Sequence, residues 1–268
     1  MKNYIFDCVT FFRENFITNL RFEILNNVVD FFIVCESTYD HRGKKKKINF
    51  RLLNKKFKNK VIHLVIKKKF EDLNPWKNQA AQREYIFNWL SLAKENDYVM
   101  FSDPDEIPNP NLLKNFKLDK KFGIFMQKSY CYKINIFNQH ESPWEGTRVV
   151  KKKNLHSIDY LRQKIVSKNL KYSFFRFDKE KDIELFNNGG WHFNNLFSPK
   201  EISIKLKTFA HSEFSDKKYS SIKVIKRNIL ERRDLFHRGR IYKKVILDNS
   251  YPKYILDNAK NLSQFLNK

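Results

Sequence analysis

The chain has 268 residues, of which 41% are hydrophobic and 16% aromatic, with only 6 Gly and 7 Pro. This composition excludes an intrinsically disordered protein and a low-complexity or repeat architecture. The formal net charge of +24 suggests a nucleic-acid partner, but the lysines are spread along the chain without a helix-turn-helix, zinc-finger or RNA-recognition motif. Abundant Lys, Asn, Ile and Phe is also typical of an AT-rich genome, so nucleic acid is not the expected partner.

The first half of the chain alternates between expected strands and helices. Apolar runs predict strands, and apolar residues at helical spacing predict helices, in the order strand 4–12, helix 17–28, strand 31–34, strand 61–66, helix 86–93 and strand 98–101. This order is typical of an α/β fold with a mixed, mostly parallel central sheet flanked by helices.

The second half has a weaker pattern. Strands are expected at 123–126 and 130–136, followed by an irregular, aromatic segment over 140–190. Ser198-Pro199-Lys200-Glu201 is a capping box with Pro at the first helical position, and it predicts a helix carrying Ile202, Leu206, Phe209 and Ala210. A last helix is expected over about 216–236, and the tail after Pro252 is expected to be helical. Because no linker is visible, we expect one domain over 1–268.

The cysteines and the N-terminal residues indicate the cellular compartment of the protein. Cys8, Cys35 and Cys131 lie in apolar, strand-like surroundings without metal-ligand spacing, which indicates buried free thiols in a reducing compartment. Residues 1–12 are too short and too polar for a signal peptide or a membrane anchor. We therefore expect a cytoplasmic protein, and peripheral contact of its basic residues with an anionic membrane stays open.

The most informative motif follows the apolar strand at 98–101. Asp103, Asp105 and Glu106 stand within four residues, and Pro104 and Pro108 in the same stretch end regular structure. In open α/β sheets ligands bind at the carboxyl ends of the strands, and clustered carboxylates there require a cation. Hard oxygen ligands suit Mg²⁺ or Mn²⁺, which often bridge a diphosphate. The alternative is a polar turn whose Asp side chains cap the next helix.

The acidic motif is part of a set of four stretches that follow one another along the chain. They are 5–12, then 29–37, then 82–83 leading to 102–108, and finally 189–193 continuing through 197–201 to 205–206. With these stretches the chain resembles glycosyltransferase family 17, the family of the β-1,4-mannosyl-glycoprotein β-1,4-N-acetylglucosaminyltransferase. The resemblance spans roughly residues 4–240.

The resemblance implies a GT-A-type nucleotide-sugar-binding fold, an inverting mechanism, a UDP-sugar donor (UDP-GlcNAc is the expected one) and Mn²⁺ or Mg²⁺. It divides the chain into a nucleotide-sugar-binding half, 1–110, an acceptor-side half, 111–240, and a C-terminal helical tail, 241–268. The expected acceptor is a glycan or glycolipid. The chain shows no anchor or lumenal stem like those of the animal enzymes, so a bacterial or viral surface glycan is a better expectation than an N-glycan.

Candidate donor-binding residues lie near the ends of the predicted strands. They are Thr10 and Phe11 at the end of the first strand, Glu36 and Ser37 at the end of the second, and Arg83 on the helix before the acidic turn. Arg83 is expected to pair with the diphosphate or to buttress the carboxylates. The alternative for these residues is an ordinary surface turn and a solvated arginine.

Asp105 is the first choice as a metal ligand, and Asp103 is expected to reach the metal or the donor ribose. Glu106 is either a third ligand or an acceptor for backbone amides of the turn. His192 and His211 are rival candidates for a further metal or phosphate ligand.

Trp191 and the general base complete the expected site. Paired glycines, Gly189 and Gly190, permit close backbone approach to a ligand, and the face of Trp191 suits stacking on a sugar ring. An inverting transfer needs one Asp or Glu as base, and the candidates are Glu145, Glu213 and Asp216. Glu145 is preferred because it stands in an aromatic loop that contains glycine.

Three other classes stay open on the sequence alone. A basic nucleic-acid-binding protein would bind with steep salt dependence and would not need Asp105. A metal-dependent nucleotide-sugar hydrolase or nucleotidyltransferase would use the same turn without an acceptor sugar, and a lectin-like module would bind glycan without UDP or metal. The expected function is nevertheless that of an inverting, metal-dependent glycosyltransferase of the hexosyl- or N-acetylglucosaminyltransferase type.

Overall fold

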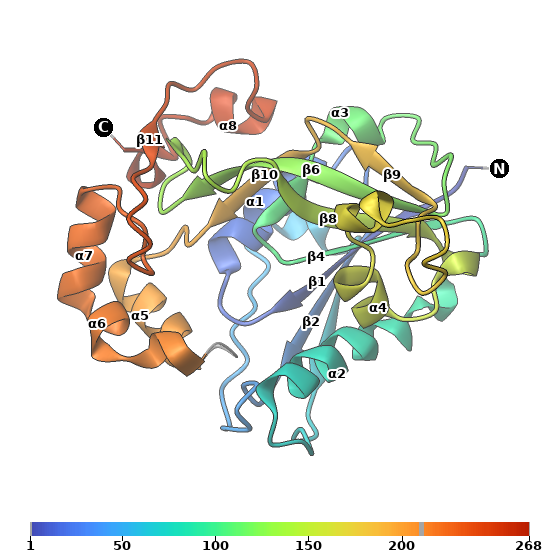
Figure 1. Ribbon diagram of the computed structural model, residues 1–268, viewed down its shortest axis with the longest axis horizontal. Helices are drawn as coiled ribbons and strands as arrows, with labels where there is room; N and C mark the ends of the chain where they lie inside the picture. The colour runs from blue at the N-terminus through green and yellow to red at the C-terminus, as the bar shows by residue number, and fades with distance from the viewer. Residues whose placement is uncertain (1, 209–211, 268) are drawn as a thin grey trace.

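A computed structural model describes residues 2–208 and 212–267, with the backbone alone at 212 and 213 (Figure 1). Its strands are β1 (Ile5–Phe11), β2 (Phe31–Ser37), β3 (Val61–Ile66), β4 (Tyr98–Ser102), β5 (Glu106–Pro108), β6 (Phe122–Cys131), β7 (Ile136–Phe137), β8 (Trp144–Lys151), β9 (Ile183–Phe186), β10 (Gly190–Asn194) and β11 (Lys243–Lys244). Its helices are α1 (Asn15–Leu25), α2 (Pro75–Phe87), α3 (Pro110–Leu113), α4 (Ile158–Gln163), α5 (Pro199–Thr208), α6 (Lys217–Ser220), α7 (Ile222–Leu230) and α8 (Lys253–Asp257).

The strands form one mixed sheet whose main path runs β11-β7-β6-β8-β4-β1-β2-β3. β1 is parallel to β2 and β4, and β2 is parallel to β3, whereas β8 is antiparallel to β4 and β6. β10 runs parallel to β6 and antiparallel to β5. The predicted α/β fold, with a mixed, mostly parallel sheet flanked by helices, is confirmed.

Both faces of the parallel half are covered. Ile5 and Val9 of β1 pack in one core cluster with Leu25 of α1. Phe6 and Cys8 point to the opposite face and pack in a second cluster with residues of α2 and α4. Successive side chains of a strand alternate between faces, so α1 lies on one side of the sheet and α2 and α4 on the other (Figure 1). This double burial explains why these strands are continuously apolar in the sequence.

The helix before β4 lies earlier in the chain than predicted. The expected helix at 86–93 is wrong, because α2 ends at Phe87 and only a short 3₁₀ turn follows at Leu90–Leu92. α2 begins at Pro75, where the side chain of Asn74 accepts from the Trp76 amide at 3.0 Å. Its apolar period is weak because its buried face is largely polar and carries Asn78, Gln79, Gln82 and Arg83.

The segment expected to be irregular, 140–190, is in fact structured. It contains β8, α4 and β9, and β8 is the strand that joins β4 to β6. β6 ends at Cys131, so the separate strand expected over 130–136 is wrong. No simple period marks β8, because it is buried on both faces from Gly146 to Val150.

Gly189 and Gly190 allow β10 to enter the sheet. A Cβ added to Gly190 would lie 2.1 Å from the carbonyl oxygen of Ile107, and one added to Gly189 would lie 2.5 Å from the Met126 amide nitrogen. Gly190 also has a φ of +132°, which L side chains rarely adopt. The close approach that the two glycines permit is therefore to neighbouring backbone, which corrects the expectation of close approach to a ligand.

The C-terminal part contains shorter helices than expected. The predicted capping box is present, since the Ser198 amide donates to Glu201 Oε2 at 2.9 Å at the start of α5. Phe209 and Ala210, expected on this helix, lie outside the described residues. The single helix expected over 216–236 is wrong, because extended backbone at Ser221 (ψ 129°) separates α6 from α7. The helical tail is represented by α8.

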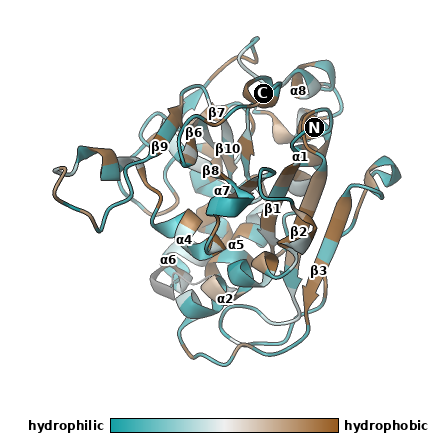
Figure 2. Ribbon diagram, turned by 90° about the vertical axis from the view of Figure 1, so that its right-hand side faces the viewer, coloured by the Kyte–Doolittle hydropathy of each residue, from teal (hydrophilic) through white to brown (hydrophobic). Residues whose placement is uncertain are grey.

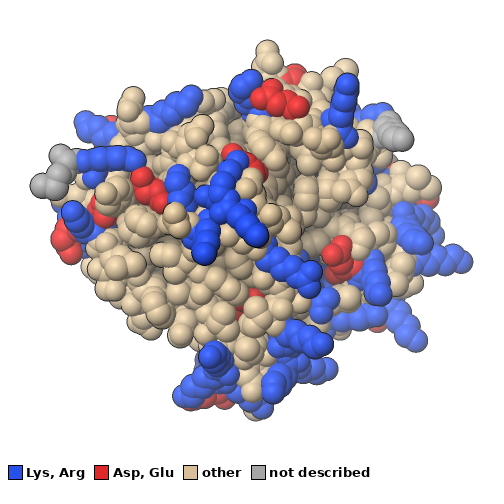
Figure 3. Space-filling model, turned by 180° about the vertical axis from the view of Figure 1, so that it is seen from behind, with Lys and Arg blue, Asp and Glu red and all other residues tan. Residues whose placement is uncertain are grey.

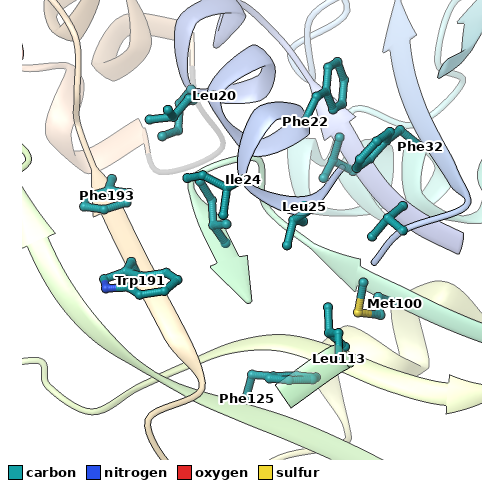
Figure 4. Packing of buried hydrophobic residues seen from close by; sticks show 14 of the residues in the cluster. Leu20, Phe22, Ile24, Leu25, Phe32, Met100, Leu113, Phe125, Trp191 and Phe193 are labelled. Carbon is teal, nitrogen blue, oxygen red and sulfur yellow. The ribbon is translucent and has the colours of Figure 1, made fainter. Parts of the chain in front are cut away.

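Trp191 belongs to the core rather than to a ligand surface. In Figure 4 it lies beside Phe193 on β10 and among the apolar side chains of the core cluster. The Trp191 Nε1 donates to the Ser250 carbonyl at 3.0 Å, so its polar atom is also satisfied inside the fold. The face that was expected to stack on a sugar is therefore used in packing.

The three cysteines are buried free thiols, as predicted, and burial raises the pKa of each of them. Figure 3 shows Lys and Arg side chains in several groups over one face of the molecule. Within the described residues, none of the helices has the length and apolar character needed to cross a bilayer.

Candidate active site

A cavity of about 480 Å³ opens at the carboxyl ends of β1 and β4. Thr10 and Phe11 line it from β1, and the acidic turn 103–106 lines it after β4. Its other walls come from the loop after β2, from α2, β8 and β10, and from the C-terminal helical part, and include His41, Gln82, Trp144, His192, Lys205, Asp234 and Arg238. Residues predicted for this edge therefore line one cavity, at the position where α/β sheets commonly bind ligands.

Arg162 of α4 binds two of the three carboxylates in the turn. Its Nη2 donates to Asp103 Oδ2 at 2.8 Å and to Glu106 Oε1 at 2.7 Å. Burial alone raises the pKa of Asp103, but Arg162 and then Arg83 hold that pKa below its ordinary value. Asp103 is therefore ionised at neutral pH. Sequence reasoning missed Arg162 because it follows the turn by 59 residues and has no motif of its own.

Arg21 of α1 holds the backbone of the acidic turn by hydrogen bonds. Arg21 Nη1 donates to the Glu106 carbonyl at 2.7 Å, and Nη2 donates to Ser102 Oγ at 2.8 Å. The same guanidinium makes two hydrogen bonds of 2.6 Å to the carboxylate of Asp7 in β1. This buried, bidentate pair links the end of β4 to β1 and so holds the turn in one conformation.

Glu106 has a positioning role. Its Oε1 accepts from Arg162 and from Trp144 Nε1, each at 2.7 Å, and its Oε2 accepts from the Asp103 amide at 3.1 Å. Of the two roles expected for it, the geometry favours acceptance of amide and side-chain donors within the turn. Because both oxygens are engaged, Glu106 is less suited than Asp105 to bind a metal.

Asp105 and His192 face each other in the cavity. Asp105 Oδ1 lies 3.8 Å from His192 Nε2, and the imidazole of His192 stacks on the Trp144 indole with ring centroids 4.7 Å apart. Burial raises the pKa of Asp105, the charges of His192 and Lys205 lower it in part, and the charges of Asp103 and Glu106 raise it. Burial is thus the main reason why the ionised form of Asp105 is disfavoured, and a bound cation would offset that cost.

These two residues fit a divalent metal as a partial site. The His192 Nδ1 is buried and has no hydrogen-bond partner within the described part of the chain. Among the described residues, 2–208 and 212–267, no three His, Cys, Asp or Glu side chains are grouped so as to hold a metal. Mg²⁺-type sites commonly combine one or two carboxylates with substrate phosphates and water. A site with open positions therefore suits a metal that shares its coordination with a bound diphosphate.

Arg83 and Gln82 lie on the buried polar face of α2. Arg83 Nη1 donates to Asp159 Oδ1 at 2.7 Å, and its positive charge lowers the pKa of Asp103. Arg83 is thus placed to buttress the carboxylates through charge. Gln82 lines the cavity, where its Oε1 lies 2.7 Å from His41 Nε2. Burial lowers the pKa of His41, which keeps its imidazole neutral.

Glu36 and Ser37 lie near the edge of the sheet but do not line the cavity. The buried carboxylate of Glu36 accepts from Lys46 Nζ and from the Asn49 amide, both at 2.7 Å. Ser37 Oγ accepts from the Tyr39 amide at 3.0 Å. Both side chains therefore hold the loop after β2, and Lys46 from that loop reaches the cavity wall instead.

The three candidate bases are placed differently from what was expected. Glu145 does not line the cavity, and its Oε2 accepts from the Ser167 amide at 3.1 Å. Asp216 is exposed and caps α6 through the Lys218 amide at 2.8 Å. The side chain of Glu213 and the whole of His211 lie outside what the structure describes. The sequence could not separate these residues because it does not show which way each side chain points.

A further part of the cavity lining, from Glu141 and from residues 234–242, was not predicted. Arg238 donates to Asp234 Oδ1 at 2.6 Å and also pairs with Glu141 at 2.9 Å, while Tyr242 donates to Asp234 at 2.9 Å. Lys205 of α5, from the 205–206 stretch named above, also lines the cavity. No period or motif marked the other residues because they stand in turns and short elements after residue 230 and around 141.

The cavity at this edge of the α/β sheet thus combines carboxylates, an imidazole and basic side chains. The family model for glycosyltransferase family 17 matches residues 1–239. The chain therefore belongs to glycosyltransferase family 17 and is an enzyme that transfers a sugar.

Other comparisons add less. No curated protein matches the chain. Among solved structures, it is similar to glucosyl-3-phosphoglycerate synthase from Mycobacterium tuberculosis, in complex with Mn²⁺, UDP-glucose and phosphoglyceric acid. The identity is 13%, the TM-score is 0.40, and the match covers 95% of this chain and 91% of that one. That likeness is too distant to assign a role to any residue.

Proposed function

We propose that this glycosyltransferase is an inverting, metal-dependent enzyme that moves a sugar, GlcNAc, from a UDP-sugar to a hydroxyl of a glycan or glycolipid. The observation that carries the proposal is the pair of Asp105 and His192, 3.8 Å apart in a cavity beside the buttressed carboxylate of Asp103. The preference for GlcNAc rests on the family resemblance alone.

In this proposal Asp105 and His192 hold Mn²⁺ or Mg²⁺, and Asp103 binds the metal or the donor ribose. When bound, such a metal acts as a Lewis acid that neutralises the diphosphate leaving group. Arg162 fixes Asp103 and Glu106 before the donor arrives, so the charged site needs little rearrangement on binding. Thr10 and Phe11 line the donor side of the cavity.

The acceptor is proposed to enter along the part of the cavity lined by Lys205, Arg238 and Tyr242, because these side chains come from the C-terminal part of the chain and not from the strand ends on the proposed donor side. The base must then be a carboxylate that lines the cavity, since a proton moves over hydrogen-bond distance. Glu145 has its carboxylate bonded to Ser167 outside the cavity and is not proposed for this step.

The test is donor binding followed by product analysis. Thermal stability is measured with a panel of nucleotide-sugars, with and without Mn²⁺, for the wild type, Asp105→Asn and the exposed control Asp119→Asn. A ligand present at ~100 times its dissociation constant stabilises the folded state by about 2.7 kcal/mol. We expect an Mn²⁺-dependent shift with UDP-GlcNAc that is lost in Asp105→Asn and retained in Asp119→Asn.

Three results would count against parts of the proposal. A shift with another nucleotide-sugar, and none with UDP-GlcNAc, would identify that nucleotide-sugar as the donor. An equal shift in the presence of a chelator would show that donor binding does not need a metal. Release of free sugar at the same rate with and without glycan acceptors would favour a hydrolase.

A further inference from the structure

The segment between α4 and β9 carries an exposed cluster of phenylalanines. Phe174, Phe175 and Phe177 expose 79%, 79% and 82% of their surface. Figure 2 shows the chain next to β9 projecting from the body of the molecule. We name residues 167–182 the aromatic loop.

The three rings form one patch. The ring of Phe174 lies 6.3 Å from that of Phe175 and 6.2 Å from that of Phe177, both in edge-on geometry. Other strongly exposed apolar side chains stand singly in the sequence, for example Leu73, Leu230 and Ile246. Single exposed apolar residues are ordinary, whereas a contiguous apolar group marks an interaction site.

Cationic side chains surround the patch. The aromatic loop contains five Lys or Arg against three acidic residues, a net charge of +2. One of the three acids, Asp178, is paired with Arg176 at 2.7 Å and with Lys179 at 3.1 Å. Apolar rings with a basic collar are the combination that binds the interface of an anionic bilayer.

The aromatic loop is ordered by its own hydrogen bonds. Lys181 Nζ donates to the carbonyls of Ser173 at 2.5 Å and Phe174 at 3.1 Å. The Arg176 amide donates to the Ser173 carbonyl at 3.0 Å, and the Lys179 amide donates to the Arg176 carbonyl at 3.2 Å. Backbone groups near a membrane must be satisfied internally, and a preformed loop loses little entropy on binding.

The base of the aromatic loop is attached to the active-site half of the enzyme. Glu145 accepts from Ser167 Oγ at 2.5 Å, and Arg148 Nε donates to the Ile165 carbonyl at 3.2 Å. Both are on β8, whose first residue, Trp144, lines the cavity. A surface held by this loop would therefore have a fixed position relative to the cavity.

We propose that the aromatic loop docks the enzyme on an anionic lipid membrane. Phe174, Phe175 and Phe177 enter the headgroup region, and the surrounding Lys and Arg contact lipid phosphates. A projecting aromatic tip with a cationic collar suits a soft, negatively charged surface better than a shaped protein groove. The inference goes beyond the proposed sugar transfer and does not depend on its donor or metal.

The test is co-sedimentation of the full chain with phosphatidylcholine vesicles that contain or lack phosphatidylglycerol. The test variant is Phe174→Ser/Phe175→Ser/Phe177→Ser. The matched control is Leu73→Ser/Leu230→Ser/Ile246→Ser, which removes three side chains that are 99%, 81% and 87% exposed but scattered. Circular dichroism and the melting temperature establish that each variant is folded.

We expect the wild type and the scattered control to bind the anionic vesicles, and the loop variant to bind at least about tenfold more weakly, since buried apolar area drives interfacial binding. Binding should also weaken as salt rises, because the collar is electrostatic. Equal binding of the loop variant and the wild type would overturn the proposal. So would absence of wild-type binding, or concentration-dependent dimerisation that the loop variant abolishes, which would identify a second copy of the chain as the occupant.

Discussion

Arg162 and Asp103 form an ion pair of 2.8 Å across 59 residues of sequence. The pair joins α4 to the turn after β4, and the same Arg162 nitrogen also holds Glu106 at 2.7 Å. The guanidinium therefore compensates the buried carboxylate of Glu106 and the partly exposed carboxylate of Asp103. Removing it would leave both without their counter-charge.

We expect Arg162→Met to lower the free energy of unfolding by about 3–5 kcal/mol, because breaking a buried pair leaves an uncompensated charge. Urea denaturation at neutral pH measures this change. The matched control is Arg233→Met, which breaks the surface pair with Glu231 at 2.8 Å and should cost at most about 1 kcal/mol. Equal losses in the two variants would show that Arg162 does not compensate the turn.

Asp105→Asn is expected to lower the rate of sugar transfer and to raise the stability of the fold. We expect kcat/KM for sugar transfer to fall on the order of 10²–10³-fold, because the variant removes a charge that acts in the site. In the presence of a chelator, the same variant should be more stable than the wild type at neutral pH. The physical reason is that burial disfavours the ionised form of Asp105 and raises its pKa, although the charges of His192 and Lys205 oppose this shift in part.

The sign of this effect gives a pH test for Asp105. A folded pKa above the unfolded value of about 3.9 means that the protonated carboxyl favours folding. The two proteins should therefore have similar stability below that unfolded pKa, and the deficit of the wild type should grow as pH rises through the folded pKa. A deficit that shrinks as pH rises would contradict the assignment. The measurement is urea denaturation of both proteins over a pH series.

Much of the fold and one wall of the site could be predicted because strong local signals mark them. The strands β1, β2 and β4 are continuously apolar and end in polar residues, so their carboxyl edge and the Asp103–Glu106 turn were found from the sequence. α2 was misplaced because its buried face consists of Gln82, Arg83 and other polar residues. A burial rule based on apolar spacing cannot detect such a face.

The remaining parts of the site depend on tertiary direction. Glu145 and Trp144 are neighbours in β8, and side chains of a strand alternate between its two faces. Trp144 therefore reaches Glu106 in the cavity, whereas Glu145 points away and binds Ser167. The sequence indicated this segment but not which of the two residues faces the cavity. Arg162 and Arg238 reach the site over long sequence distances, which no local pattern records.

The two tryptophans give a paired prediction. Trp144→Phe should keep the fold but lower kcat/KM by about tenfold, because Glu106 loses the donor that positions it. Trp191→Phe should instead lower the free energy of unfolding by about 1–3 kcal/mol, since it loses core volume and a hydrogen bond to Ser250. Steady-state kinetics and urea denaturation on both variants distinguish these roles. The reverse pattern would place Trp191, not Trp144, at the substrate.

Glu36, near the carboxyl end of β2, allows a test of how the loop after this strand is held. Burial alone raises the pKa of Glu36, but His63, Lys46 and the amides of Phe50 and Asn49 together lower it below the ordinary value. A lowered folded pKa means that the carboxylate stabilises the protein above the unfolded pKa of about 4.3. That contribution is lost as pH falls through the folded pKa.

Glu36→Gln should therefore lower the free energy of unfolding by about 1–3 kcal/mol at neutral pH, and the difference from the wild type should shrink as the solution is acidified. Hydrogen exchange at the Asn49 and Phe50 amides should become faster, because both donate to this carboxylate. Glu71→Gln, at an exposed pair with Lys68, is the control and should leave these amides unchanged. Unchanged exchange in Glu36→Gln would mean that the loop after β2 is held by its backbone alone, and Lys46 would then owe its place at the cavity wall to something other than Glu36.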